Sequence, residues 1–180
     1  MRRMFVAIDL PESVKAFLTQ LRDDGLKGIR WVRPENQHLT MRFLGDIDEE
    51  AEKRLRAELS SVSVSRFTLP IGGFGTFPGK GDPKVLWIGV GSAHPLLFQL
   101  RQRIDDAVLK AGIDCEMRDF VPHVTLGRCS SVSRASLRDL KKRVESADSP
   151  VFAVKTFSLF ESRPSPIGSR YEIVDAWDLR

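Results

Sequence analysis

The feature that most constrains the fold is a pattern that occurs twice along the chain. An apolar strand is followed by an amphipathic helix and by a later strand that contains His-x-Thr. The interval from Phe5 in the first strand to His38 is 33 positions, and the interval from Trp87 in the second copy to His123 is 36. The matching contents at the ends of the two units indicate duplication of one structural unit.

Local sequence signals predict a mixture of helices and strands. Apolar runs predict strands at residues 4–10, 37–44, 66–74, 84–90, 121–128, 151–161 and 170–178. Apolar residues at helical spacing predict helices that begin at Pro11, behind Asp48, at residue 94 and behind Ser133. The Gly- and Pro-rich stretch before residue 84 is typical of a loop.

Length and composition bound the class of protein. The 180 residues suit one domain over residues 1–180, or two small lobes that share a core, and 42% hydrophobic and 29% charged residues are ordinary for a globular protein. No run of about 18 apolar residues is present to span a membrane, and Asp9 and Pro11 interrupt the apolar N-terminal stretch. A cytoplasmic protein is therefore expected, with Cys115 and Cys129 as reduced thiols. The net charge of +4 is too mild to establish nucleic-acid binding.

The strand at residues 37–44 is predicted to carry a histidine on a polar face. Because successive side chains of a strand point to opposite faces, alternation predicts that His38, Thr40 and Arg42 share one face. The side chains between them are expected in the core: Leu39, Met41 and Phe43. A lone histidine in a strand is more often structural than catalytic, so this motif indicates a catalytic site only together with its second copy.

The second motif repeats this arrangement. His123 and Thr125 are predicted to share a face, with Val124 and Leu126 opposite them. Arg128 lies five positions after His123, so strict alternation puts it on the core face, and only a β-bulge or a strand end would turn it towards the histidine. Because the apolar faces must form the core, a histidine and a hydroxyl group from each unit are expected to face one groove.

Two imidazoles that face one groove suit hydrolysis of a phosphodiester. One takes a proton from water while the other donates a proton to the leaving oxygen, and the ordinary histidine pKa of about 6.5 is close to working pH. Thr40 and Thr125 are candidates for hydrogen bonds to the non-bridging phosphate oxygens, and Arg42 or Arg128 for charge-assisted bonds. The third histidine, His94, lacks the motif and is expected at a helix start.

Metal-dependent chemistry fits the sequence poorly. There is no His-Glu-x-x-His, no His-x-His and no acidic cluster beside either motif. The run Gly72-Gly73-Phe74-Gly75 does not precede a helix, so it indicates a turn or bulge and not a nucleotide-binding loop. Neither a metal nor a cofactor is predicted.

With both motifs identified, the chain resembles the two-histidine (2H) phosphoesterase superfamily. Within it, the chain is similar to the bacterial RNA 2′,3′-cyclic phosphodiesterases, also called 2′-5′ RNA ligases (LigT-like). The resemblance extends over nearly the whole chain. It rests on the segments Phe5 to Pro11, His38-Leu39-Thr40-Met41 with Phe43-Leu44-Gly45, Phe74-Gly75-x-Phe77-Pro78 with Leu86-Trp87-Ile88-Gly89-Val90, Pro122-His123-Val124-Thr125-Leu126 with Arg128, and Leu159, Ser162, Gly168 and Tyr171.

The resemblance implies a fold and a reaction. The fold is α+β, with two pseudo-symmetric lobes, each an antiparallel sheet with helices outside, forming a central V-shaped groove. The reaction is metal-independent hydrolysis of an RNA terminal 2′,3′-cyclic phosphate to a 2′-phosphomonoester, together with a weak reversible joining of RNA ends through a 2′-5′ bond. By resemblance His123 is the base that activates water and His38 the acid that protonates the 3′ oxygen, although the pseudo-symmetry leaves the reverse assignment open. Arg128 is carried over as a phosphate-groove residue, and Phe5 and Arg42 as candidates for the RNA-binding face.

Three other functions are alternatives to this hydrolysis. The same site could join tRNA halves as a 2′-5′ RNA ligase, or act on a small nucleotide such as an ADP-ribose cyclic phosphate. An RNA-binding module without turnover would not need two facing histidines and would favour stacking aromatics, which the aromatic content of 8% does not support. The expected partners are RNA ends or nucleotides with a 2′,3′-cyclic phosphate, with no membrane and no obligate protein partner, and the chain is expected to be a monomer.

Overall fold

The computed structural model describes residues 1–91, 94–114, 119–166 and 168–180. Its strands are β1 (Arg2–Asp9), β2 (Ile29–Trp31), β3 (His38–Ile47), β4 (Phe67–Phe77), β5 (Val85–Val90), β6 (His123–Cys129), β7 (Val151–Val154), β8 (Thr156–Ser165) and β9 (Gly168–Asp178). Its helices are α1 (Glu12–Gln20), the short 3-10 helix η1 (Pro34–Asn36), α2 (Glu49–Leu59), α3 (Pro95–Lys110) and α4 (Arg134–Ser146).

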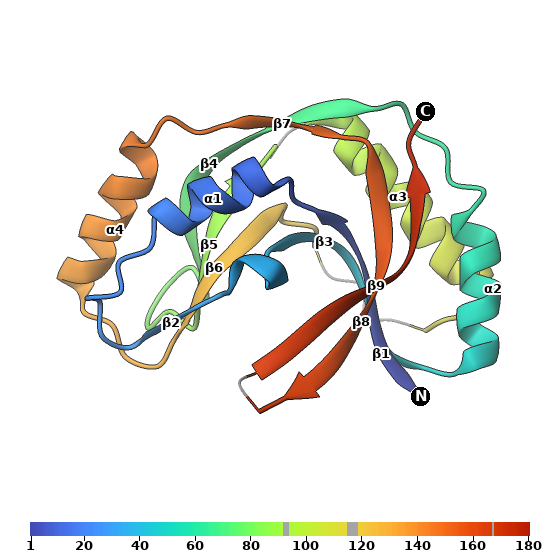
Figure 1. Cartoon of the computed structure of the whole chain (residues 1–180), viewed down its shortest axis with the longest axis horizontal. Helices are drawn as coiled ribbons and strands as arrows, with labels where there is room; N and C mark the ends of the chain where they lie inside the picture. Colours follow the sequence, from blue (N-terminus) through green and yellow to red (C-terminus); the bar gives the residue numbers. More distant parts are fainter. Residues whose placement is uncertain (92–93, 115–118, 167) are drawn as a thin grey trace.

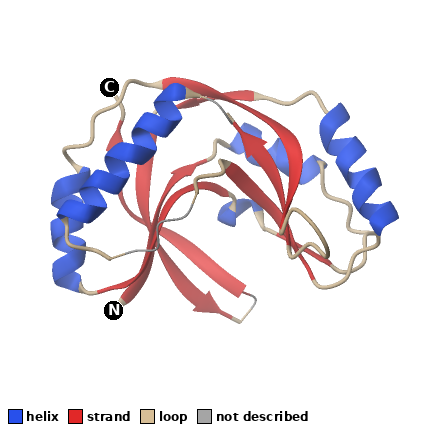
Figure 2. Ribbon diagram, turned by 180° about the vertical axis from the view of Figure 1, so that it is seen from behind, coloured by secondary structure: helices blue, strands red, loops and turns tan. Residues whose placement is uncertain are grey.

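The strands form a strongly curled antiparallel sheet in the order β7-β4-β5-β6-β3-β1-β8-β9, with β2 paired to β6. One lobe consists of β3, β1, β8 and β9, and α2 and α3 lie beside it (Figure 1). The other lobe consists of β6, β5, β4 and β7, with α1 and α4 on its side. Figure 2 shows the same division from behind. The predicted α+β fold of two pseudo-symmetric antiparallel lobes is confirmed.

The chain passes from one lobe to the other before α1 and again before α3. The chain leaves β1 in the first lobe and forms α1 on the side of the second lobe, near α4 (Figure 1). It later leaves β5 in the second lobe and forms α3, which packs against α2 and β3 of the first lobe. This exchange ties the two halves together.

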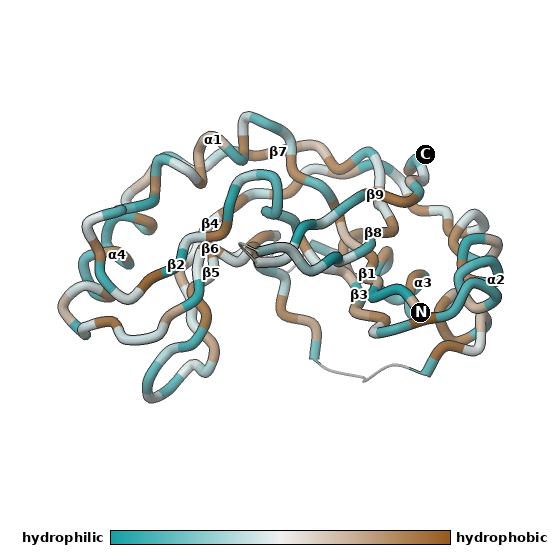
Figure 3. The backbone as a smooth tube through the Cα atoms, turned by 60° about the horizontal axis from the view of Figure 1, so that its bottom comes forward, coloured by the Kyte–Doolittle hydropathy of each residue, from teal (hydrophilic) through white to brown (hydrophobic). Residues whose placement is uncertain are grey.

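The main core lies between the helices and one face of the sheet. The predicted apolar stripe of α3 is buried as expected, with Leu97, Leu100 and Ile104 at 0% exposure. In contrast, the outward turns of α2 are hydrophilic along most of its length (Figure 3). The predicted caps are also present, because the side chain of Asp48 accepts a hydrogen bond from the backbone of Ala51 at 2.8 Å, and the Ser133 hydroxyl caps α4.

The two lobes meet between the two His-x-Thr motifs. In the described part of the sheet, β3 and β6 share one register pair, Leu39 with Val124, and both side chains are fully buried. Continuing the same antiparallel register puts His38 across from Thr125, and His123 across from Thr40. The junction therefore brings both motifs to one place on the face that the helices do not cover.

A β-bulge in β3 makes one part of the alternation prediction wrong. In the pairing with β1, Val6 is opposite Arg42 and Ala7 is opposite Thr40, so Met41 is the extra residue. The bulge reverses the faces of the residues that follow it. Arg42 is consequently buried, with 4% exposure, and does not share the face of His38, whereas Phe43 leaves the core and is 67% exposed.

A matching bulge in β6 has the opposite consequence for Arg128. In the pairing with β5, Trp87 is opposite Thr125 and Leu86 is opposite Gly127, so Leu126 is the extra residue. Arg128 is thereby turned onto the face of His123 and is exposed. The β-bulge that Arg128 needs in order to share the face of His123 is therefore present. Arg128 occupies the position in β6 that Phe43 occupies in β3.

Three elements differ from the sequence prediction. Strand β2 and helix η1 were not predicted, because they are only three residues long each and show no periodicity. The strand predicted at residues 151–161 is divided into β7, which pairs with β4, and β8, which pairs with β1. Cys129 is a free, half-buried thiol, and Cys115 lies outside the described residues.

Candidate active site

The site is centred on the motif residues at the lobe junction. His38 and Thr40 come from β3, and His123 and Thr125 come from β6. All four side chains are partly exposed, while the residues between them, Leu39 and Val124, are buried. Directly opposite residues on an antiparallel pair lie about 5 Å apart and diagonal ones about 7–8 Å. The two histidines lie on a diagonal, close enough for a charge on the His123 ring to lower the pKa of His38.

Both imidazoles are held by the same backbone contact. Nδ1 of His38 lies 2.8 Å from the carbonyl oxygen of Asn36, and Nδ1 of His123 lies 2.7 Å from that of Val121. A carbonyl oxygen only accepts, so in each ring Nδ1 carries the hydrogen and donates it. Nε2 of each histidine is therefore the ring nitrogen available to accept or donate a proton.

Aromatic rings pack around His38 from the first lobe. The rings of Phe5, Phe160 and Tyr171 have centroids 4.8, 6.0 and 5.2 Å from that of His38. Phe5, Phe160 and Ala7 form a small buried cluster separate from the main core, and Tyr171 packs against it. Phe5 is 3% exposed, so its place is beneath the His38 ring and not on an open surface.

His123 has its own aromatic neighbours in the second lobe. The Phe77 ring approaches it edge-on, with centroids 5.0 Å apart, and the Trp87 ring lies at 5.8 Å. A Cβ atom on Gly75 would lie 2.0 Å from the Trp87 ring, so only glycine leaves room for this indole. The alternation of β5 puts Trp87 on the same face as Thr125 and His123. The sequence predicts this alternation, but only the structure shows that the indole lies against His123.

Burial lowers the pKa of both histidines. The pKa of His38 falls to about 4, chiefly because desolvation penalises the imidazolium form. The hydrogen bond to Asn36 and the negative charge of Asp9 act in the opposite direction, and His123 adds to the lowering. Desolvation lowers the pKa of His123 as well. Both rings are consequently neutral in the empty site at neutral pH.

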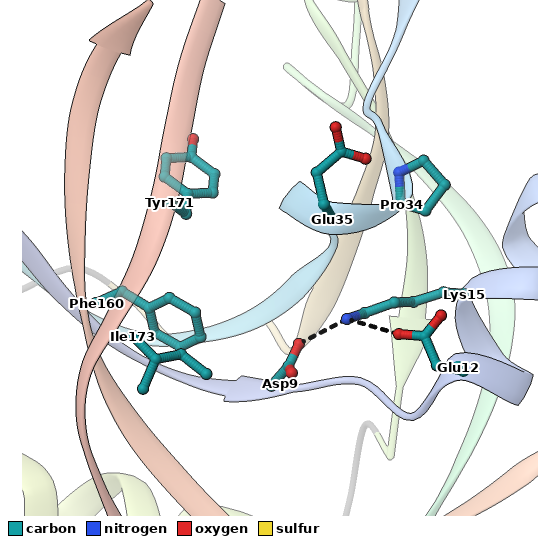
Figure 4. A pocket seen from close by; sticks show the side chains of 8 residues that line it. All are labelled: Asp9, Glu12, Lys15, Pro34, Glu35, Phe160, Tyr171 and Ile173. Atoms are coloured by element: carbon teal, nitrogen blue, oxygen red, sulfur yellow. Dashed lines mark ion pairs between the residues drawn. The ribbon is translucent and has the colours of Figure 1, made fainter.

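A pocket of about 500 Å³ lies between the end of β1, α1, η1 and the β8–β9 hairpin (Figure 4). Asp9, which lies opposite His38 in the β1–β3 register, lines one wall of the pocket together with Lys15. The ammonium group of Lys15 contacts Asp9 at 3.0 Å and Glu12 at 3.5 Å. Phe160 and Tyr171 line the opposite wall. The pocket thus combines an aromatic wall with a charged wall next to the proposed acid–base group.

Arg42 lies away from this site, which corrects its assignment to the RNA-binding face. Its guanidinium group forms an ion pair with Asp105 of α3, at 2.6 Å for both Nε–Oδ1 and Nη2–Oδ2. Asp105 also pairs with Arg101 at 2.8 Å, and Arg101 donates to the carbonyl oxygen of Met41, the bulged residue. Arg42 therefore takes part in a buried network that holds the bulge.

One contact links the site to the projecting hairpin formed by β8 and β9. The side-chain amide of Asn36 donates a hydrogen bond to the carbonyl oxygen of Ser169 at 2.7 Å. The same residue holds Nδ1 of His38 through its backbone. Asn36 carries no signal in the sequence, because its role depends on two segments that are 133 positions apart.

No metal centre is evident in the described ranges, where no group of three or more His, Cys, Asp or Glu side chains is placed to hold an ion. His94 lies outside the site, at the start of α3, where its ring stacks on Phe67 with centroids 5.0 Å apart. No helix in the described part of the chain is long and apolar enough to cross a membrane.

Comparison with known families bears on these observations. The model of the LigT like phosphoesterase family matches the chain twice in succession, over residues 8–87 and 88–171. The chain belongs to the LigT-like phosphoesterase family. Each of the two matches contains one His-x-Thr motif, the first with His38 and the second with His123.

Curated relatives and solved structures of this family match over almost the full length. The RNA 2′,3′-cyclic phosphodiesterase of Methanocaldococcus jannaschii is 32% identical, over 97% of this chain and 99% of that protein. The protein of the same name from Thermotoga maritima is 31% identical, over 96% and 92%. The crystal structure of E. coli LigT in apo form superposes with a TM-score of 0.80 at 27% identity, covering 99% of this chain and 97% of that one.

Proposed function

We propose that this LigT-like phosphoesterase hydrolyses the terminal 2′,3′-cyclic phosphate of RNA to a 2′-phosphomonoester. The observation that carries the proposal is the junction of the lobes, where Leu39 pairs with Val124 and one histidine from each motif faces the same space. The names of the relatives support the same substrate class. Hydrolysis of a phosphodiester needs a base on one side of phosphorus and an acid on the other, which this arrangement provides.

In the proposed reaction each histidine moves one proton. Nε2 of His123 takes a proton from a water molecule, and the water oxygen forms a bond to phosphorus. Nε2 of His38 donates its proton to the 3′ oxygen as the bond between phosphorus and that oxygen breaks. The product carries a 2′-phosphate and a 3′-hydroxyl. Thr40 and Thr125 donate hydrogen bonds to the non-bridging oxygens, which hold the charge of the transition state.

The low pKa of His38 makes its protonation depend on the substrate. At a pKa of about 4, the ring is neutral in the empty site at pH 7 and has no proton to give. A bound phosphate anion stabilises the imidazolium form and raises this pKa. Substrate binding and protonation of His38 are therefore coupled, and His38 is an imidazolium only when substrate is bound.

A first experiment measures hydrolysis of a short RNA that ends in a 2′,3′-cyclic phosphate, in excess EDTA. We expect wild type to yield only the 2′-phosphate, and His38→Ala and His123→Ala each to be slower by about 10² or more. His94→Gln is the matched control, because His94 is outside the site. Equal rates in wild type and either alanine variant, or complete loss of wild-type activity in EDTA, would sink the metal-free paired mechanism.

A second experiment assigns the acid. A substrate whose 3′ bridging oxygen is replaced by sulfur has a leaving group that needs no proton. We expect the defect of His38→Ala to shrink with this substrate, while that of His123→Ala remains. The reverse pattern would exchange the two roles.

A further inference from the structure

We propose that Arg30 and Arg128 together form a second phosphate subsite, which binds the internucleotide phosphate on the 5′ side of the terminal nucleoside. The proposal rests on the proposed function and deepens it, because it makes the preferred substrate an RNA strand and not a lone nucleotide. It also gives a role to strand β2, which sequence analysis did not detect.

Strand pairing places the two arginines side by side. In the pairing of β2 with β6, Arg30 lies directly opposite Arg128. Directly opposite residues of an antiparallel pair point to the same face, about 5 Å apart. Both side chains are exposed.

Gly127 shows which face the pair occupies. A Cβ atom on Gly127 would lie 2.9 Å from Cγ2 of Ile29 and 3.5 Å from Cε3 of Trp31, so these two side chains fill the face behind Gly127. Both pack against the main core. Arg30 and Arg128 alternate with these residues, and they therefore point to the other face, which carries Thr125 and His123.

The arrangement is unfavourable unless an anion is present. Like charges directly opposite each other on a sheet are destabilising. Across the ranges that the structure describes, no ion pair or side-chain hydrogen bond joins Arg30 or Arg128 to a carboxylate. Two guanidinium forks that converge without an acidic partner are suited to a phosphate.

The distance between the arginine pair and the histidines indicates which phosphate of an RNA strand the arginines bind. On the site face, His38 and Thr125 form one row across the sheet, and the bulge at Leu126 makes the Arg30–Arg128 row the next one. Successive rows on one face are about 7 Å apart, which is two residues along a strand. This step is comparable with that between neighbouring phosphates of an extended RNA strand. A cyclic phosphate between the histidines lies about half a row beyond the His38–Thr125 row, so the next phosphate is within reach of the long arginine side chains.

The test compares two dinucleotide substrates that both end in a 2′,3′-cyclic phosphate. One has a normal, negatively charged internucleotide phosphate, and the other has a neutral methylphosphonate at that position. We expect wild type to prefer the charged substrate by about tenfold in kcat/KM, the size of one charge-assisted contact. Arg30→Ala should reduce this preference to about one and leave hydrolysis of the methylphosphonate substrate unchanged. Arg138→Ala, which removes one exposed arginine from α4, is the control of equal charge and should keep the preference.

The possible outcomes separate this inference from the proposed function. A preference that persists in Arg30→Ala, or an equal loss on both substrates, would overturn the second subsite while leaving the hydrolase intact. If wild type hydrolyses neither substrate, the proposed function fails. The subsite is then decided by titration with the two corresponding dinucleotide 2′-phosphates, where it predicts the same tenfold ratio in Kd for wild type and none for Arg30→Ala.

Discussion

Nδ1 of His38 donates a hydrogen bond to the carbonyl oxygen of Asn36, two residues earlier, over 2.8 Å. This contact fixes the tautomer of the ring and turns Nε2 towards the site. It also holds the half-buried imidazole in one orientation through a backbone carbonyl and not a carboxylate, while desolvation keeps the pKa of the ring low. The first two predictions concern this pKa.

Titration of the empty protein should show a strongly depressed pKa for His38. Because desolvation lowers it from 6.5 to about 4, the ring should remain neutral well below pH 6, and addition of inorganic phosphate or a 2′-phosphate product should raise its midpoint. NMR of the imidazole carbons, assigned by comparison with His38→Gln, measures both values. A midpoint near 6.5 without ligand would contradict the argument from burial.

The same shift predicts an acid-dependent loss of stability. The unfolded chain binds a proton at this residue near pH 6.5, whereas the folded chain does so near pH 4. The stability contributed by neutral His38 is therefore complete above pH 6.5 and is lost as the pH falls towards 4. At 1.36 kcal/mol for each unit, wild type should lose about 3 kcal/mol more than His38→Gln between pH 7 and pH 4. Urea unfolding at a series of pH values measures the difference, and parallel curves would refute it.

The pH profiles of kcat/KM and kcat should differ. The profile of kcat/KM reports the free protein, in which both histidine pKa values are lowered, so its limbs should lie below pH 6.5. The profile of kcat reports the occupied site, where the phosphate anion stabilises imidazolium, so its limbs should lie at higher pH. Steady-state rates from pH 3.5 to 9 provide both curves. If the two profiles superpose, bound substrate does not raise the pKa of His38.

Substitutions in the buried network of Arg42, Arg101 and Asp105 should lower the stability of the protein by different amounts. Asp105→Asn leaves both Arg42 and Arg101 without their carboxylate, and breaking such a buried pair costs about 3–5 kcal/mol. Arg42→Met should cost less, because Arg101 still neutralises Asp105. Equilibrium unfolding of the two variants ranks them. An equal or reversed order would show that Arg101 does not compensate.

Substitution of Gly75 should disturb catalysis at a distance from the reacting atoms. A Cβ atom at this position would lie 2.0 Å from the Trp87 ring, which packs against His123. In Gly75→Ala the indole must move, so kcat should fall several-fold and the tryptophan emission should shift. Gly79→Ala is the matched control, because a Cβ atom there has open space up to 4.0 Å. Unchanged kcat in Gly75→Ala would show that Trp87 does not position His123.

Much of the fold and part of the site follow from local sequence alone. The strand with His38, the strand with His123 and the apolar stripe of α3 were predictable because alternation and helical periodicity are properties of consecutive residues. The repeat of His-x-Thr was visible for the same reason, and it indicated a duplicated unit that the two successive family matches support.

Only the tertiary structure decided the faces of the residues behind each motif. Met41 and Leu126 are the extra residues of two β-bulges, since neither is paired with the neighbouring strand. Nothing in either residue by itself predicts a bulge at that position. The two bulges send Arg42 into the core, expose Phe43 and turn Arg128 towards the site. The pairing of Arg30 with Arg128 likewise joins strands almost 100 positions apart. A sequence defines which side chains are available, whereas pairing between distant strands determines which of them meet.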